Sequence, residues 1–140
     1  MFLFLATLAF GYDIYSTWSQ HPDLIVCQDS GVNNKKVLDA IDYWSNRGYK
    51  VNDIIFKKNC EEEIIQGKIV IFKDYGRVKE KEYGRTHVVW KDGYMAHATV
   101  FISEDALDSL TVIKHEIGHS FGIKHTKDIH DIMYGKVSND

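Results

Sequence analysis

Three histidines and one glutamate are concentrated near the end of the chain, at His115, Glu116, His119 and His125. In a helix, residues four apart lie one turn apart, so His115 and His119 can direct two imidazole nitrogens toward one metal ion. Glu116 is offset by one residue and flanks that face without sharing it. A carboxylate in this position can act as a general base without becoming a ligand. The spacing therefore indicates a zinc site.

Gly122 stands three residues after His119 and three before His125. Glycine adopts a positive φ readily, which ends a helix and turns the chain back. His125 can then reach the same metal as the two helical histidines. Three histidine ligands leave the fourth position of a tetrahedral zinc ion open for water, which is typical of a catalytic rather than a structural site.

These five positions resemble the His-Glu-x-x-His-x-x-Gly-x-x-His signature of the metzincin zinc peptidases. The following run Ile132-Met133-Tyr134 is similar to the Met-turn of that clan, and its spacing most resembles the matrixin branch. By that resemblance the three histidines bind one catalytic Zn²⁺, Glu116 is the general base and then the acid, and Met133 is the floor beneath the metal. Gly122 and Tyr134 support the site, and the implied reaction is hydrolysis of peptide bonds in an extended polypeptide.

The sequence also departs from the matrixin pattern. Gly135 stands where a proline commonly follows Met-Tyr, and the sequence ends at Asp140. We therefore expect the site without the helix that usually follows the Met-turn and helps to wall the pocket for a substrate side chain. We also expect neither a Pro-Arg-Cys-Gly-type latency segment nor a propeptide of useful size before Leu24.

The remaining segments alternate between strand and helix patterns. Strands are predicted at 24–27, 53–56, 68–72, 86–90 and 94–103. One helix is predicted after a cap at Asn33 or Asn34, running through Trp44 and stopped by Gly48, and a second from about Leu107 to Phe121. The short Lys91-Asp92-Gly93 connection predicts a hairpin, so the last two strands are antiparallel neighbours. The predicted fold class is α/β (α+β): a mixed, twisted five-stranded sheet with one antiparallel edge strand, a packing helix and an active-site helix. By the metzincin resemblance, the first hairpin strand is the rim on which an extended peptide lies.

Each predicted helix has one apolar face that must pack against the sheet. In the first helix, spacings of three and four place these residues together: Val37, Leu38, Ile41 and Trp44. In the second helix, the apolar stripe lies nearly opposite the histidines and consists of Leu110, Ile113, Ile117 and Phe121.

Length and charge limit the domain organisation and the partners. A chain of 140 residues is the usual size of one domain, so residues 12–140 are predicted to form a single catalytic domain after an apolar segment at 1–11. A net charge of −3 without a Lys/Arg-rich stripe argues against nucleic acid or an anionic membrane as the main partner. The apolar start is too short for a transmembrane span.

Two interpretations of residues 1–11 stay open. The run from Met1 to Phe10 has the length of the apolar part of a secretory signal peptide but lacks a basic flank, and a signal peptide implies a secreted or extracytoplasmic protein. The alternative is a segment that docks on a protein partner. It accompanies a second functional hypothesis, in which the chain is a zinc-stabilised assembly or interaction module of a larger complex with little or no peptidase activity.

Cys27 and Cys60 lie near the edges of two predicted strands, outside any Cys-x-x-Cys pattern. The sequence allows either one disulfide between them, which export would favour, or two buried free thiols.

Neither calcium nor a second zinc ion is predicted. The residues His87, Asp92 and His97 do not reproduce the spacing of the second, structural metal site that matrixins carry. The scattered acids, such as Asp74, lack a twelve-residue calcium loop.

Overall fold

A computed structural model describes residues 11–136 of the chain. Residues 1–10, which contain nearly all of the predicted apolar N-terminal segment, and residues 137–140 lie outside the described residues. Within 11–136, no helix is long and apolar enough to cross a membrane.

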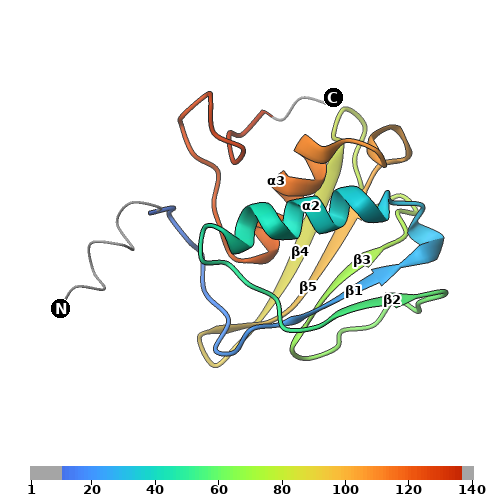
Figure 1. Ribbon diagram of the computed structural model, residues 1–140, viewed down its shortest axis with the longest axis horizontal. Coiled ribbons are helices and arrows are strands. Elements are labelled where there is room, and N and C mark those ends of the chain that lie inside the picture. Colours follow the sequence, from blue (N-terminus) through green and yellow to red (C-terminus); the bar gives the residue numbers. More distant parts are fainter. Residues whose placement is uncertain (1–10, 137–140) are drawn as a thin grey trace.

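One twisted five-stranded sheet forms the framework (Figure 1). Its strands in chain order are β1 (Asp23–Cys27), β2 (Ile54–Lys57), β3 (Lys68–Phe72), β4 (Gly84–Lys91) and β5 (Tyr94–Ile102). Across the sheet the order is β2-β1-β3-β5-β4, and every neighbouring pair is parallel except β4 and β5. The predicted mixed sheet is confirmed, and the antiparallel strand β4 lies at its edge.

The predicted hairpin joins β4 to β5. Lys91 pairs with Tyr94, and the two residues between them, Asp92 and Gly93, have φ values of 53° and 82°. Positive φ at both positions is the conformation of a two-residue turn whose twist matches that of the flanking strands. β4 begins at Gly84, earlier than predicted, because this residue still pairs with β5.

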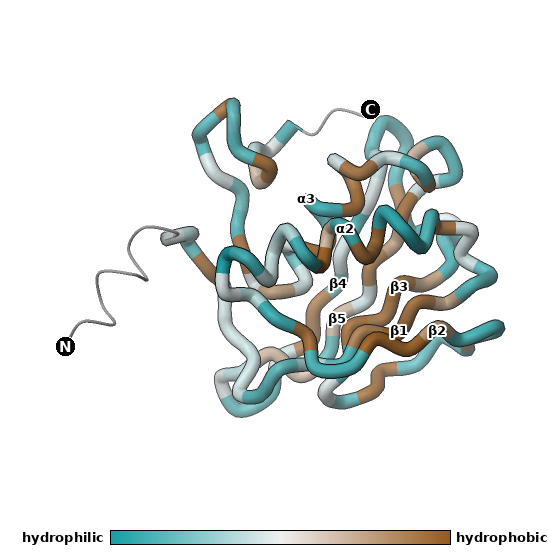
Figure 2. Tube along the Cα trace, viewed as in Figure 1, coloured by the Kyte–Doolittle hydropathy of each residue, from teal (hydrophilic) through white to brown (hydrophobic). Residues whose placement is uncertain are grey.

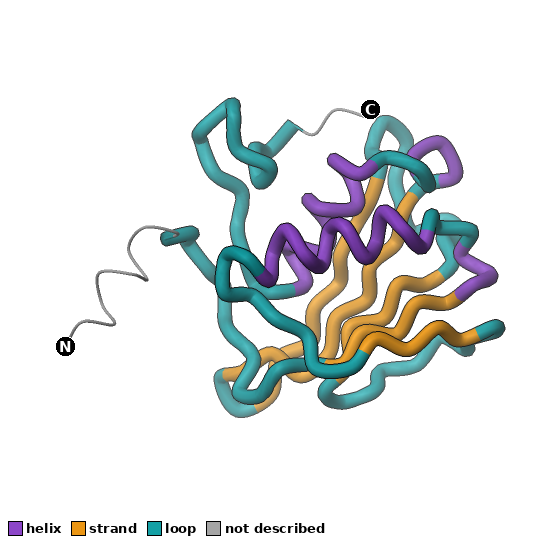
Figure 3. The backbone as a smooth tube through the Cα atoms, in the orientation of Figure 1, coloured by secondary structure: helices purple, strands orange, loops and turns teal. Residues whose placement is uncertain are grey.

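Helices α2 (Asn34–Ser45) and α3 (Leu110–Ser120) cover the same face of the sheet (Figure 3). Asn33 caps α2 as predicted, since its side chain accepts a hydrogen bond from the Lys36 backbone N–H. The indole Nε1 of Trp44 donates to the Lys114 carbonyl at 2.8 Å and ties α2 to α3. The predicted packing helix and active-site helix are therefore both present.

Two details of the predicted helices were wrong. α3 begins at Leu110 rather than Leu107, because Ser109 accepts a hydrogen bond from the Val112 N–H and caps the helix there. In α2, Leu38 is 38% exposed, and Ala40 is buried in its place. Leu38 lies about 100° around the helix from the core-facing residue before it.

The central strands carry buried apolar residues on both faces of the sheet, and the traces of β1 and β3 are mostly brown in Figure 2. The main core lies between the sheet and the helices, and its largest fully buried residues include Leu24, Trp44, Ile69, Ile113 and Ile117. A smaller cluster on the opposite face consists of Ile25, Cys27, Val70, Phe72 and Phe101. Loops rather than helices cover this second cluster, with Cys60, Ile65 and Val78 packed against it.

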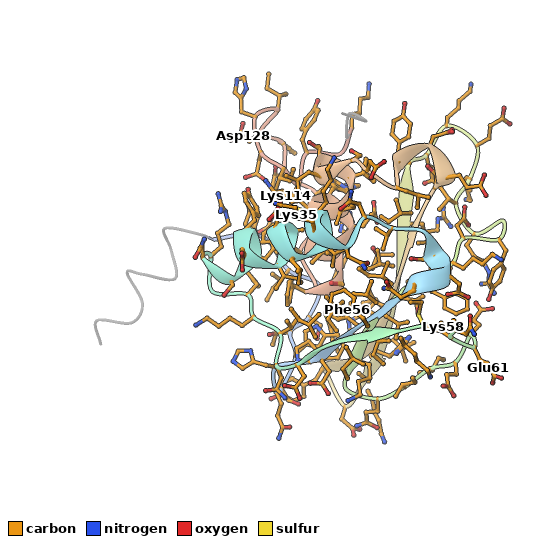
Figure 4. All side chains as sticks on the ribbon, turned by 45° about the vertical axis from the view of Figure 1, so that its right-hand side comes forward. Lys35, Phe56, Lys58, Glu61, Lys114 and Asp128 are labelled. Atoms are coloured by element: carbon orange, nitrogen blue, oxygen red, sulfur yellow. A yellow bond between two sulfur atoms is a disulfide. The ribbon has the colours of Figure 1, made fainter. Side chains whose placement is uncertain are left out.

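A disulfide between Cys27 and Cys60 fastens one of these covering loops to the end of β1. The sequence left this pairing open, and the structure decides it. Figure 4 shows Lys58 and Glu61, which flank Cys60 on the loop after β2, at the margin of the molecule. The disulfide thus holds an exposed loop over the smaller apolar cluster.

Removal of this disulfide should lower the stability of the protein. The bond closes a loop with a sequence separation of 33, for which the chain-entropy model gives about 3 to 4 kcal/mol. We expect the paired variant Cys27→Ala with Cys60→Ala to unfold at a lower urea concentration than the oxidised wild type. Added reductant should shift the wild type toward the variant and leave the variant unchanged, and coincident unfolding curves would contradict the prediction.

Candidate active site

The three histidines of the motif converge on one point. His115 and His119 lie one turn apart on α3, and His125 follows the helix. Their Nε2 atoms are separated by 3.2 Å between His115 and His119, 3.2 Å between His115 and His125, and 3.0 Å between His119 and His125. The predicted set is therefore assembled, with each ring presenting the same nitrogen to the centre.

Backbone carbonyls determine which nitrogen of two of these rings carries the proton. Nδ1 of His115 lies 2.8 Å from the Ile132 oxygen, and Nδ1 of His119 lies 2.8 Å from the Ile123 oxygen. A carbonyl oxygen only accepts, so each Nδ1 must donate, and each Nε2 keeps a lone pair. The two facing lone pairs, 3.2 Å apart, have no proton between them, and a shared cation would relieve their repulsion.

This arrangement fits a tetrahedral zinc ion. Two ligands on a zinc with Zn–N bonds of roughly 2.0–2.1 Å lie about 3.3 Å apart, close to the separations of the three Nε2 atoms. Burial lowers the pKa of His115, and it lowers the pKa of His119 to about 4, with the neighbouring histidines adding to the effect. Neutral imidazoles are the form that binds a metal.

Gly122 allows the chain to return after α3. Its φ is +91°, in the left-handed region, and its N–H donates to the His119 carbonyl. A Cβ at this position would lie 2.0 Å from the Ser16 carbonyl oxygen. The glycine is therefore required both by its backbone conformation and by the close passage of the N-terminal arm, which we define as residues 12–18.

His125 is itself exposed, yet both of its neighbours are anchored. The Lys124 N–H donates to the Asp13 carbonyl in the N-terminal arm at 2.9 Å. On the other side, the Thr126 N–H donates to the Met133 carbonyl at 3.0 Å, and Thr126 pairs with Tyr134. The third histidine is thus held between the N-terminal arm and the Met-turn.

Met133 is fully buried beside α3. Its sulfur occupies space that a side chain on Gly118 of α3 would need. Asp131 organises the turn, because its carboxylate accepts hydrogen bonds from the Met133 N–H and from the Tyr12 hydroxyl. The Met-turn is therefore packed against α3 and linked to the N-terminal arm.

Glu116 is only 5% exposed and lines the same cleft as the histidines. Burial raises the pKa of its carboxyl to about 7, while the hydrogen bond from Thr86 opposes that rise. Thr86 Oγ1 lies 2.8 Å from Glu116 Oε1. A dication bound beside the carboxylate would lower this pKa and favour the ionised form.

The cleft has a volume of about 700 Å³ and runs along β4. Its walls come from the N-terminal arm, the segment before β4, β4 itself, α3 and the segment after the Met-turn. The lining residues are Tyr15, Lys81, Glu82, Tyr83, Gly84, Arg85, Thr86, Val88, Trp90, His115, Glu116, His119, His125, Gly135 and Lys136. A metal-ligand triad and a buried carboxylate at the bottom of a cleft along a sheet edge are the parts of a metallopeptidase site.

A comparison with known protein families matches the matrixin family over residues 26–140. The chain belongs to the matrixin family. Matrixins are zinc-dependent endopeptidases of the metzincin clan, and the histidine cluster with Glu116 beside it agrees with the family's zinc-binding motif. A comparison with curated proteins finds no match.

Sequence reasoning missed several residues that build this matrixin site. Thr86 and Gly84 contact Glu116, while Tyr12 and Asp131 link the N-terminal arm to the Met-turn. Their partners lie far away in the sequence, so no local pattern identifies them. Of these four residues only Asp131 had a sequence signal, as the first residue of the run from Asp131 to Tyr134 that resembles the matrixin Met-turn.

Other predicted or considered residues lie away from the cleft. Tyr134 lines a separate hollow with Tyr43, and it contacts the site through its backbone pairing with Thr126. His97 is buried on the opposite face of the sheet, with its ring nitrogens bonded to Ile65 and Thr99.

The buried carboxyl should make the stability of the metal-free matrixin depend on pH. The folded-state pKa of Glu116 is raised from 4.5 to about 7, so the cost of burying the ionised carboxylate is absent well below pH 4.5, grows as the pH rises from 4.5 to 7 and is fully present above pH 7. We expect metal-free Glu116→Gln to be more stable than the wild type at pH 7.5, by on the order of 3 kcal/mol. The difference should shrink to less than about 0.5 kcal/mol at pH 4.5.

Urea unfolding in the presence of a chelator, at both pH values, measures this difference. Glu63→Gln is the matched control, because it makes the same chemical change at an exposed position on the other face of the sheet. A stability difference for Glu116→Gln that is the same at both pH values would contradict the prediction.

Proposed function

We propose that His115, His119 and His125 hold the catalytic zinc ion of this matrixin and that Glu116 is the general base. The observation that carries the proposal is the set of three Nε2 atoms within 3.2 Å of one another, together with the two backbone carbonyls that accept from Nδ1 of His115 and His119 and leave their Nε2 atoms free to bind a metal. Met133 supports the three rings from below. Gly122 and the backbone of Tyr134 support the return of the chain to His125.

Glu116 has the position and the environment for proton transfer. When bound, zinc supplies a Lewis acid that polarises the scissile carbonyl and lowers the pKa of a water molecule toward about 7. The Glu116 carboxylate accepts a proton from the attacking water and delivers it to the leaving amine nitrogen. The low exposure of the carboxylate keeps bulk water from competing for this proton.

The substrate is a polypeptide that binds in an extended conformation along β4. Among the described residues β4 pairs only with β5, so the backbone groups of its other edge can bind an added strand. Aromatic side chains from two segments meet the cleft: Trp90, on β4, is 51% exposed, and Tyr15, in the N-terminal arm, is 62% exposed. They offer apolar contact to a substrate side chain remote from the scissile bond.

We further propose that residues 12–140 act as one catalytic domain with a single zinc ion, without calcium or a second zinc. The disulfide and the matrixin family favour a secreted or extracytoplasmic location. A protein partner for residues 1–11 stays a hypothesis, since ten of these residues lie outside the described part of the chain.

Metal analysis tests the ligand set. We expect about one zinc per wild-type chain and a loss of that zinc in His119→Ala, because the two remaining histidine nitrogens cannot hold the ion as tightly as three. His21→Ala is the control, since His21 is an exposed histidine far from the cluster. A folded wild type that takes up no zinc, or a His119→Ala variant that keeps its zinc, would contradict the ligand assignment.

Glu116→Gln tests the general base. The variant should bind zinc as the wild type does and hydrolyse an unfolded protein substrate at least about 100-fold more slowly, since an amide cannot accept the water proton. Activity is followed by the release of new amino termini. Full activity in Glu116→Gln would exclude the assigned role, and an inactive wild type across a broad substrate panel would favour the assembly module.

A further inference from the structure

The carboxylate of Glu116 is held by β4 as well as by its own helix. Thr86 Oγ1 lies 2.8 Å from Glu116 Oε1 and 3.0 Å from the Glu116 backbone oxygen. A hydroxyl has one proton to donate, and an ionised carboxylate is the stronger acceptor. The proton of Thr86 is therefore directed to Oε1 whenever Glu116 is charged.

Gly84 encloses the same side chain from the beginning of β4. A Cβ at this position would lie 2.6 Å from Glu116 Cγ and 3.1 Å from Cδ. Residues two apart in a strand face the same side, so Gly84 and Thr86 contact Glu116 together. The backbone at Gly84 limits the movement of the Glu116 side chain at Cγ and Cδ, and Thr86 fixes the direction of the carboxylate.

This double contact has a consequence for proton transfer. A general base acts well only when its oxygen is held within hydrogen-bond reach of the proton it abstracts. The last torsion angle of a glutamate side chain, χ3, has a broad distribution, so the helix alone does not fix the plane of the carboxylate. One hydrogen bond to Oε1 removes that freedom and leaves Oε2 for the reacting water.

We propose that Thr86 is a positioning residue for Glu116, with Gly84 providing the space for the carboxylate. The inference rests on the proposed role of Glu116 as general base. Thr86 donates a hydrogen bond throughout and transfers no proton. Because Thr86 belongs to the edge strand that binds the substrate, the same strand aligns the peptide and the base that acts on it.

Thr86→Val tests the proposal, because valine keeps the shape of threonine and lacks the hydroxyl. We expect kcat to fall by about 10- to 100-fold, the range for losing a hydrogen bond to a charged group, while KM and the zinc content stay unchanged. Thr86→Ser restores the hydroxyl and should recover most of the lost kcat. Thr111→Val makes the same change on α3, beside a hollow that the cleft does not include, and should leave kcat unchanged.

Several outcomes would overturn the positioning role. One is an unchanged kcat in Thr86→Val, another is a rise in KM alone, which marks a substrate contact, and a third is a failure of Thr86→Ser to recover activity, which marks a packing role of the methyl group. Thr86→Ala serves as a second variant without the hydroxyl. If both hydroxyl-free variants fail to fold or to bind zinc, Thr86 is a structural residue and the proposal fails.

The role of Glu116 as general base can be contradicted by a separate set of results. An inactive wild type or an active Glu116→Gln would remove the general base, and the positioning role would fall with it. An active wild type, an inactive Glu116→Gln and a fully active Thr86→Val would overturn the positioning role alone.

Discussion

The site depends on holding imidazole nitrogens close together without a proton between them. The carbonyls of Ile123 and Ile132 each accept a hydrogen bond from Nδ1 of one helical histidine, so the Nε2 lone pairs of His115 and His119 face each other at 3.2 Å. Like lone pairs repel, and the surrounding packing must hold them there. The packing therefore preorganises the two nitrogens for a shared cation.

The segments that hold His125 beside this pair come from both ends of the described chain. The N-terminal arm anchors Lys124, the Met-turn anchors Thr126, and the two are joined by the hydrogen bond from Tyr12 to Asp131. Burial and the adjacent carboxylate raise the pKa of Tyr12, which keeps the phenol protonated and able to donate. His125, the exposed ligand, thus belongs to a closed set of contacts around the end of α3.

The sheet contributes to the chemistry through its edge. β5 pairs with one edge of β4, and no strand within residues 11–136 pairs with the other edge, while Thr86 and Gly84 on the same strand contact Glu116. The strand is held firmly because β5 continues into a sheet that is apolar on both faces, one covered by helices and the other by disulfide-linked loops. A rigid edge lets substrate alignment and base alignment share one element.

The sequence by itself determined the parts that depend on local periodicity. Helical spacing placed His115 and His119 one turn apart, and strand patterns with a two-residue turn predicted the antiparallel edge. Helix capping was harder to predict. The predicted start of α3 at Leu107 was wrong because the Ser109 side chain caps the helix and makes Leu110 its first residue. Which of two states the cysteines adopt was not encoded in their spacing.

The tertiary structure alone decided what holds these parts in place. Tyr12 meets Asp131 across 119 positions, and Thr86 meets Glu116 across 30. No periodicity links such partners, since their contact exists only after the sheet, the helices and the N-terminal arm have packed. The metal-binding residues are thus local in sequence, whereas the orientation of the base and the third histidine depends on long-range hydrogen bonds and close backbone contacts.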